Sequence, residues 1–184
     1  LNIKLIESDQ IGTVGVGEAT IPPMINFNEL AGINEPDFLV ATPAPFTLGL
    51  SFESWRNVNE HYIHSFGFTG KDHWTAGFQH FWLKGRERRL AGDYGEYCLE
   101  VKAMQENRFA HLPENGLNYA YQLDATIYAK YLRKLSEARG VDRIEGKIAE
   151  VKTDPASGDI TALRLESGDV IEGDLFIDCT GFRS

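Results

Sequence analysis

The last third of the chain alternates apolar and polar residues with a period of two, which is typical of strands with one buried face. Residues 144–154, 160–166 and 170–179 follow this pattern, and the segments PASGD and SGD between them carry turn chemistry. The third stretch ends in DLFIDC, an apolar run typical of a buried strand. The pattern predicts a three-stranded β-meander whose last part is a final buried strand.

A helix is predicted immediately before the meander. Its apolar stripe recurs at helical spacing and consists of Ile127, Tyr128, Tyr131, Leu132, Leu135 and Ala138. Asp124 is a candidate N-cap residue, and Gly140 is a candidate stop.

The first two thirds of the chain mix both patterns. IKLIE at residues 3–7, FTLGLSFESW and HYIHSFGF are β-prone, whereas residues 78–108 are rich in helix formers with a break at AGDYG. Thr20 with Pro22 and Asn34 with Pro36 predict two helix starts, and Gly32 predicts the end of the first helix. The order of these elements predicts an α/β or mixed α+β fold.

Composition narrows the class of protein. The 184 residues, 42% of them hydrophobic, suit one or at most two domains with a real core. Lys and Arg number 18 against 27 Asp and Glu, a net charge of −9, which disfavours nucleic acid and anionic membranes as partners. Two cysteines, no long apolar run and no charged-then-apolar leader favour a cytoplasmic protein.

The segment GTVGVGEATIPPM, residues 12–24, raises the question of a ligand. It fails the dinucleotide motif because Thr20 stands at the sixth position counted from Gly15, and it lacks the Gly-Lys-Ser/Thr of a Walker motif. A glycine-rich turn before a helix is the simplest interpretation. Glu18 instead favours contact with a flat ligand, because it lies in a segment where Gly15 and Gly17 permit close approach to the backbone.

The histidines offer one further site. His61 and His64 have metal-ligand spacing, with His73 and His80 downstream. Because neither a cysteine pair nor a carboxylate frames them, we expect ordinary surface or core histidines and no metal site.

Several long motifs share one resemblance. IKLIES, VGEATIP, LDATIYAKYLRK and GDLFIDCTGFR occur in the order seen in the flavin-dependent tryptophan halogenase family, which the chain resembles over essentially its whole length. The resemblance implies a partial FAD-monooxygenase-type fold whose G-x-G-x-x-G motif precedes residue 1. We therefore expect residues 1–184 to be a fragment of one FAD-binding domain, with residues 40–123 on the substrate side.

The resemblance also implies which residues bind FAD. Glu7 and Ser8 match the end of the strand near the adenosine part, where an acid suits a ribose hydroxyl. Ile11, Gly17, Glu18 and Ala19 match the family stretch that runs along the flavin. Ile148 matches an apolar contact to the cofactor. Asp178, Thr180 and Gly181 match the late strand whose end lies near the cofactor. Taken without the resemblance, Ile148 is equally a core strand residue, and Asp178 a satisfied buried acid.

On the substrate side, PAPFTLGLSFESWR is similar to the family segment that holds a lysine. Thr47 occupies the position of that lysine, and its hydroxyl is an uncharged donor that cannot form a haloamine. His64 and Phe66 match the two rings that sandwich the indole, and Ser65 stands where the family usually has proline.

The resemblance implies an enzyme. Its activity would be FAD-dependent halogenation of an indole-like aromatic substrate with reduced flavin, O₂ and halide, carried out by the longer protein. A separate flavin reductase would supply the reduced FAD. Because of Thr47, an aromatic monooxygenase or oxidoreductase without halogenase activity is the alternative. The third hypothesis is a binding module without enzymatic activity that uses an aromatic cluster, Trp74, Phe78, Phe81 and Trp82, for a partner. We expect the fragment alone to be inactive.

Overall fold

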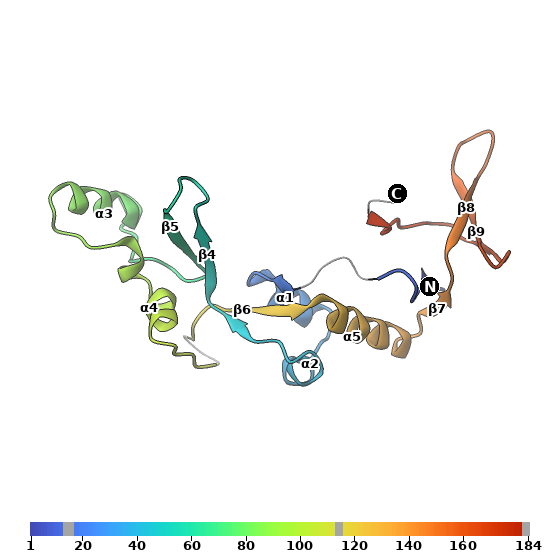
Figure 1. Ribbon diagram of the computed structural model, residues 1–184, viewed down its shortest axis with the longest axis horizontal. Coiled ribbons are helices and arrows are strands. Elements are labelled where there is room, and N and C mark those ends of the chain that lie inside the picture. Colours follow the sequence, from blue (N-terminus) through green and yellow to red (C-terminus); the bar gives the residue numbers. More distant parts are fainter. Residues whose placement is uncertain (13–16, 113–115, 182–184) are drawn as a thin grey trace. The chain divides into compact units, whose positions relative to one another are not determined.

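A computed structural model describes residues 1–12, 17–112 and 116–181 (Figure 1). The chain divides into two compact units, one formed by residues 1–14 with 129–184 and the other by residues 15–128. Helices and both parallel and antiparallel strand pairs are present, so the predicted mixed α/β class is confirmed. Among the described residues, no helix has the length and apolarity needed to cross a bilayer.

The first unit contains one parallel strand pair. Strand β1 (Lys4–Glu7) pairs with β7 (Asp142–Glu145), with Glu7 opposite Glu145. Helix α5 (Ala125–Ala138) enters this unit from residue 129. The predicted cap of α5 is confirmed, because Asp124 Oδ1 accepts from the amides of Thr126 and Ile127 at 2.8 and 2.9 Å.

The predicted β-meander is confirmed as the sheet β10-β9-β8. Its strands are β8 (Ile148–Thr153), β9 (Ile160–Leu165) and β10 (Val170–Glu172). The predicted stretch 144–154 is divided between two strands, since β7 ends at Glu145 and β8 begins at Ile148. Between them, the Gly146 amide donates to Glu7 O at 2.9 Å. Ala162 and Leu165 of β9 are buried.

The predicted final buried strand is wrong. Residues 175–180 form no strand, and the side chains of Leu175 and Ile177 are each 81% exposed. The apolar run suits a buried strand, but within the described ranges no strand pairs with it, so its backbone lacks the ladder that defines a strand.

The second unit is organised around strand β6 (Ala120–Asp124). Strand β2 (Gly17–Ala19) pairs antiparallel with one edge of β6, and β3 (Phe46–Thr47) pairs antiparallel with the other. β6 is buried at three of its five residues, Ala120, Tyr121 and Leu123. It therefore forms the centre of this unit.

Thr20 does not cap a helix, contrary to the sequence prediction. Its hydroxyl donates to Tyr121 O at 2.9 Å and accepts from the Tyr121 amide at 3.0 Å, so the side chain is bound to β6. Helix α1 (Pro23–Leu30) begins later, with Pro22 at its N-cap and no side-chain cap. The predicted stop is confirmed, since Gly32 follows the helix end with a φ of 63°.

The other elements of this unit agree with the sequence pattern. Helix α2 (Glu35–Ala41) begins after Asn34, whose side chain accepts from the Asp37 amide at 3.1 Å, as predicted. Strands β4 (Gly49–Glu53) and β5 (His61–Ser65) form an antiparallel pair. Helix α3 (Phe78–Glu87), the 3₁₀ turn η1 (Tyr94–Tyr97) and helix α4 (Leu99–Gln105) follow, with the expected break between α3 and α4.

Candidate functional site

Strand β6 joins two parts of the predicted site on one sheet. Ala19 of β2 lies opposite Gln122, and Thr47 of β3 lies opposite Ala120 on the other edge. Because neighbouring strands are about 4.8 Å apart, these two edges are separated by roughly 10 Å. The predicted flavin stretch and the position of the family lysine are thus fixed to one five-residue strand.

The predicted flavin stretch is open on the side away from β6. Gly17, Glu18 and Ala19 are all exposed, and β2 is an edge strand of its sheet. Among the described residues, a Cβ placed on Gly17 would meet only Leu123 O, at an ordinary contact distance of 3.9 Å. The protein's own side chains therefore leave room for a flat cofactor beside this backbone, which fits the flavin. Residues 13–16, with Gly15, lie outside the described residues.

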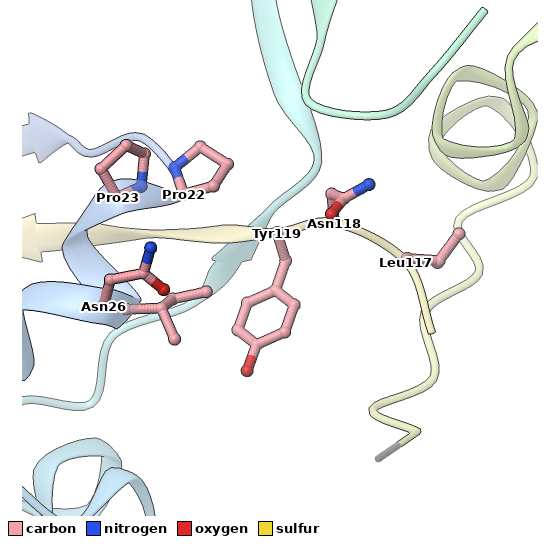
Figure 2. Close-up of a pocket in the computed structure, with 7 residues that line it drawn as sticks. Pro22, Pro23, Asn26, Leu117, Asn118 and Tyr119 are labelled. Carbon is pink, nitrogen blue, oxygen red and sulfur yellow. The ribbon is translucent and has the colours of Figure 1, made fainter. Parts of the chain in front are cut away.

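An open cavity of about 340 Å³ adjoins this sheet. Figure 2 shows Pro22, Pro23 and Asn26 from the start of α1, together with Leu117, Asn118 and Tyr119 from the segment that enters β6; Ile25 completes the lining. The sequence prediction missed this cavity. Its two halves are about 90 residues apart in sequence, and only the pairing of β2 with β6 brings them together.

Thr47 is half-buried, and its hydroxyl is already engaged. Oγ1 donates to Gly49 O at 2.8 Å, which satisfies the hydroxyl within the local backbone. The neighbouring Phe46 ring stacks on Phe109 with centroids 4.4 Å apart. The position of the family lysine is therefore ordered but uncharged.

The two predicted substrate rings lie on or just after β5. His64 lies opposite Leu50 in the β4–β5 pair, and its side chain is exposed. The Phe66 amide donates to Leu48 O at 2.9 Å, which places Phe66 beside the residue that follows Thr47. The structure thus brings Phe66 close to the lysine position along the backbone, and the role of both rings in binding indole stays a prediction.

A polar network that the sequence analysis missed supports the β3–β6 pair. Glu35 Oε1 accepts from the hydroxyls of Tyr119 and Tyr121 at 2.7 and 2.5 Å. His111 Nε2 lies 3.4 Å from Glu35 Oε2 and 3.0 Å from the Tyr119 hydroxyl. Burial, and next the hydrogen bond to Glu35, raise the pKa of both tyrosines well above the ordinary value of 10.0. No sequence motif links these residues, although Glu35 in the first turn of α2 is visible as a capping-region acid.

In the first unit, Glu7 is held by two arginines. Its Oε1 accepts from Arg143 Nε at 2.5 Å and from Arg133 Nη1 at 2.9 Å, and Arg143 also binds Glu145. The hydrogen bond from Arg143, opposed by desolvation, lowers the pKa of Glu7. The two side-chain hydrogen bonds to Glu7 both end on Oε1. Ser8 beside it is only 8% exposed.

The remaining predicted cofactor residues are exposed in their own unit. Ile11 is 45% and Ile148 38% exposed, so Ile148 is no core residue of this unit. Asp178 is not a buried acid: it is exposed, and its Oδ1 accepts from the amide and hydroxyl of Thr180 at 2.8 and 2.7 Å. These bonds lower the pKa of Asp178. Gly181 has a φ of 66°.

The histidines assemble no metal site in the described part of the chain. No group of three His, Cys, Asp or Glu side chains there could hold a metal ion. His73 Nδ1 instead lies 2.9 Å from the Thr75 hydroxyl.

The chain has the fold of the matching part of flavin-dependent halogenases, as comparison with solved structures shows. Xcc4156, a flavin-dependent halogenase from Xanthomonas campestris, is 63% identical to this chain, and the two superpose with a TM-score of 0.93. The match covers the whole of this chain and 37% of Xcc4156. The model of the tryptophan halogenase family matches residues 1–184. The chain belongs to the tryptophan halogenase family.

Two curated relatives extend the comparison. The 7-chloro-L-tryptophan 6-halogenase KtzR of Kutzneria sp. (strain 744) is 33% identical over the whole chain, and the tryptophan 7-halogenase RebH of Lentzea aerocolonigenes is 31% identical over 99% of it. The chain spans 40% of the length of the first and 38% of the second.

Proposed function

We propose that the complete protein carrying this chain is an FAD-dependent halogenase of an indole-like aromatic substrate. The observation that carries the proposal is the open Gly17–Ala19 backbone, held by β6 on the same sheet as the position of the family lysine. The family match over the whole chain supports the same activity. Residues 40–123 would supply the substrate side.

FAD would be bound by the residues that the family resemblance indicates. Gly17, Glu18 and Ala19 would face the flavin, with Ile11, Ile148 and Gly181 as further contacts. Glu7 would accept a ribose hydroxyl through Oε2, because Arg133 and Arg143 both bind Oε1, and Ser8 would lie beside it. When bound and reduced, FAD supplies with O₂ and halide the oxidised halogen that the reaction uses.

The chain's own residues would orient the substrate. His64 and Phe66 would stack on an aromatic ring, and such stacking fixes orientation as well as burying apolar surface. Thr47 would offer an uncharged hydroxyl beside the reacting ring, where the family has an ammonium. The partners would be the aromatic substrate, a halide and a separate flavin reductase. We place the protein in the cytoplasm, supported by its two unpaired cysteines.

Thr47 favours one alternative, an aromatic monooxygenase of the same superfamily. A neutral hydroxyl cannot hold an electrophilic halogen as a haloamine, so the oxidant would reach the ring in another form. The relatives named above are all halogenases and give this alternative no support.

The test is to supply the full-length gene product with FAD, a flavin reductase, bromide and indole, and to analyse the products by mass spectrometry. Brominated indole is the expected result. Hydroxylated indole without any brominated product would overturn the halogenase proposal in favour of the monooxygenase. If FAD does not bind at all, the binding module remains.

A further inference from the structure

Glu100 is a buried carboxylate with a complete set of partners. It lies in the first turn of α4 and is only 5% exposed. Its Oε1 accepts from the backbone amide of Asn118 at 3.0 Å and from Asn118 Nδ2 at 3.3 Å, and its Oε2 accepts from the Cys98 thiol at 3.5 Å. A buried charge is costly unless it is hydrogen-bonded, and here both oxygens are.

The same carboxylate packs against the segment that follows β5. Ser65 Oγ lies 3.0 Å from Cys98 Sγ and accepts from the Gly67 amide at 3.0 Å. A Cβ on Gly67 would overlap the Glu100 carboxylate itself, so only glycine lets the two approach so closely. Phe66 is held between Ser65 and Gly67.

Three segments distant in sequence therefore meet at Glu100. One carries the predicted substrate ring Phe66, another is α4, and the third carries Asn118, which lines the cavity beside β2 (Figure 2). We propose that Glu100 is a positioning residue that fixes Phe66 and Asn118 relative to one another and so sets the angle at which the aromatic substrate is presented. This inference rests on the proposed function, because it assigns the role of that same site.

Two substitutions disturb this arrangement differently. Glu100→Gln keeps the volume but replaces a charged acceptor with an amide, which weakens the bonds from Asn118 and the Cys98 thiol. Gly67→Ala keeps Glu100 but displaces its carboxylate. Glu106→Gln is the matched control, because Glu106 is the exposed C-cap residue of the same helix.

The experiment measures two quantities in the full-length protein. The first is the ratio of products substituted at different ring positions, which does not depend on how much enzyme is folded. The second is the dissociation constant of indole at equilibrium, without turnover. For Glu100→Gln and Gly67→Ala we expect the ratio to change and indole binding to weaken about tenfold, because small misplacements cost large factors in rate and affinity. FAD affinity should stay unchanged, and the Glu106→Gln control should match the wild type.

The outcomes separate the two claims. A wild-type protein that neither binds nor converts indole overturns the proposed function, and this inference falls with it. An active wild type whose product ratio and indole affinity are the same in Glu100→Gln and Gly67→Ala overturns this inference alone. A loss of activity at constant ratio and constant indole affinity also overturns it, because that is the result of a purely structural role.

Discussion

Thr47 lies opposite Ala120 in the β3–β6 pair. Its hydroxyl donates a hydrogen bond to the carbonyl oxygen of Gly49, two residues further along the chain, and not to Ala120. The backbone at this position is therefore set by the ladder and does not depend on the threonine side chain. A longer side chain can replace it without a change in register.

Thr47→Lys should raise bromination of indole by the full-length protein. A lysine ammonium would restore the charged donor that the family has here, and one such donor at a reacting centre is worth roughly 10²-fold in rate. Product formation per minute, measured with saturating flavin reductase, checks this. Thr47→Met gives a side chain of similar length without charge and should show no gain; an equal gain in both variants would show that the ammonium is not the cause.

Gly17→Ala should weaken FAD binding while leaving the fold intact. Among the described residues the added methyl would meet only Leu123 O, at an ordinary contact distance, so the stability should change by less than about 0.5 kcal/mol. Under the proposed function the methyl would take space that the flavin needs. We expect FAD affinity to fall about tenfold in a fluorescence titration.

Gly49→Ala provides the contrast. Its Cβ would lie 2.6 Å from the carbonyl oxygen of His64, so it should destabilise the β4–β5 pair by about 1–3 kcal/mol in denaturant unfolding. Unchanged FAD affinity in Gly17→Ala would argue against flavin contact at β2.

Arg143→Gln should raise the pKa of Glu7. The hydrogen bond from Arg143 is the largest cause of its lowered value, and Arg133 would keep part of the effect. Because the folded pKa lies below the ordinary value of 4.5, this pairing stabilises the fold above that pH, and the stabilisation is lost as the pH falls through the folded pKa. As the pH falls through this range, the free energy of unfolding should therefore decrease less in Arg143→Gln than in the unsubstituted protein.

Carboxyl NMR shifts followed against pH give the measurement. Arg164→Gln is the control, since Arg164 pairs with Glu150 at 2.7 Å and lowers the pKa of that acid instead. A Glu7 titration that is unchanged in Arg143→Gln would contradict the arrangement described above.

Glu35→Ala should destabilise the β3–β6 region. It leaves the hydroxyl of the buried Tyr121 without its acceptor, at a cost of about 1–3 kcal/mol in the free energy of unfolding. In the unsubstituted protein, Tyr119 and Tyr121 should stay protonated at pH values above their ordinary pKa of 10.0. Tyrosinate absorbance against pH measures this. In Glu35→Ala the pKa of both tyrosines should fall, while burial, the larger cause, keeps it above the ordinary value of 10.0.

The local elements were predictable because their signals are local. Asn34 and Asp124 cap their helices as the sequence indicates, and the meander follows its period of two. Thr20 misled the prediction because a threonine before a proline has the composition of a cap, whereas its hydroxyl binds Tyr121, 101 residues away. The helix start was decided by a partner that no local window contains.

The site shows the same limit more strongly. In the sequence, the glycines of GVGEA (residues 15–19) and the acid Glu18 predict a ligand contact. The longer motifs, such as LDATIYAKYLRK, predict the family. The carboxylate of Glu100 and the hydroxyl network at Glu35 gave no signal, because each is defined by groups that approach only after the strands have paired. Glu7 was recognised as an acid at a strand end, but the arginines that hold it come from residues more than 120 positions away.

The central place of β6 has a consequence for which substitutions the second unit can tolerate. The gap between the flavin-side strand and the strand of Thr47 is spanned by main-chain hydrogen bonds, which are indifferent to side-chain identity. Under the proposed function, substitutions at His64 and Phe66 would alter which aromatic ring is accepted, while the main-chain ladder keeps the spacing between β2 and β3.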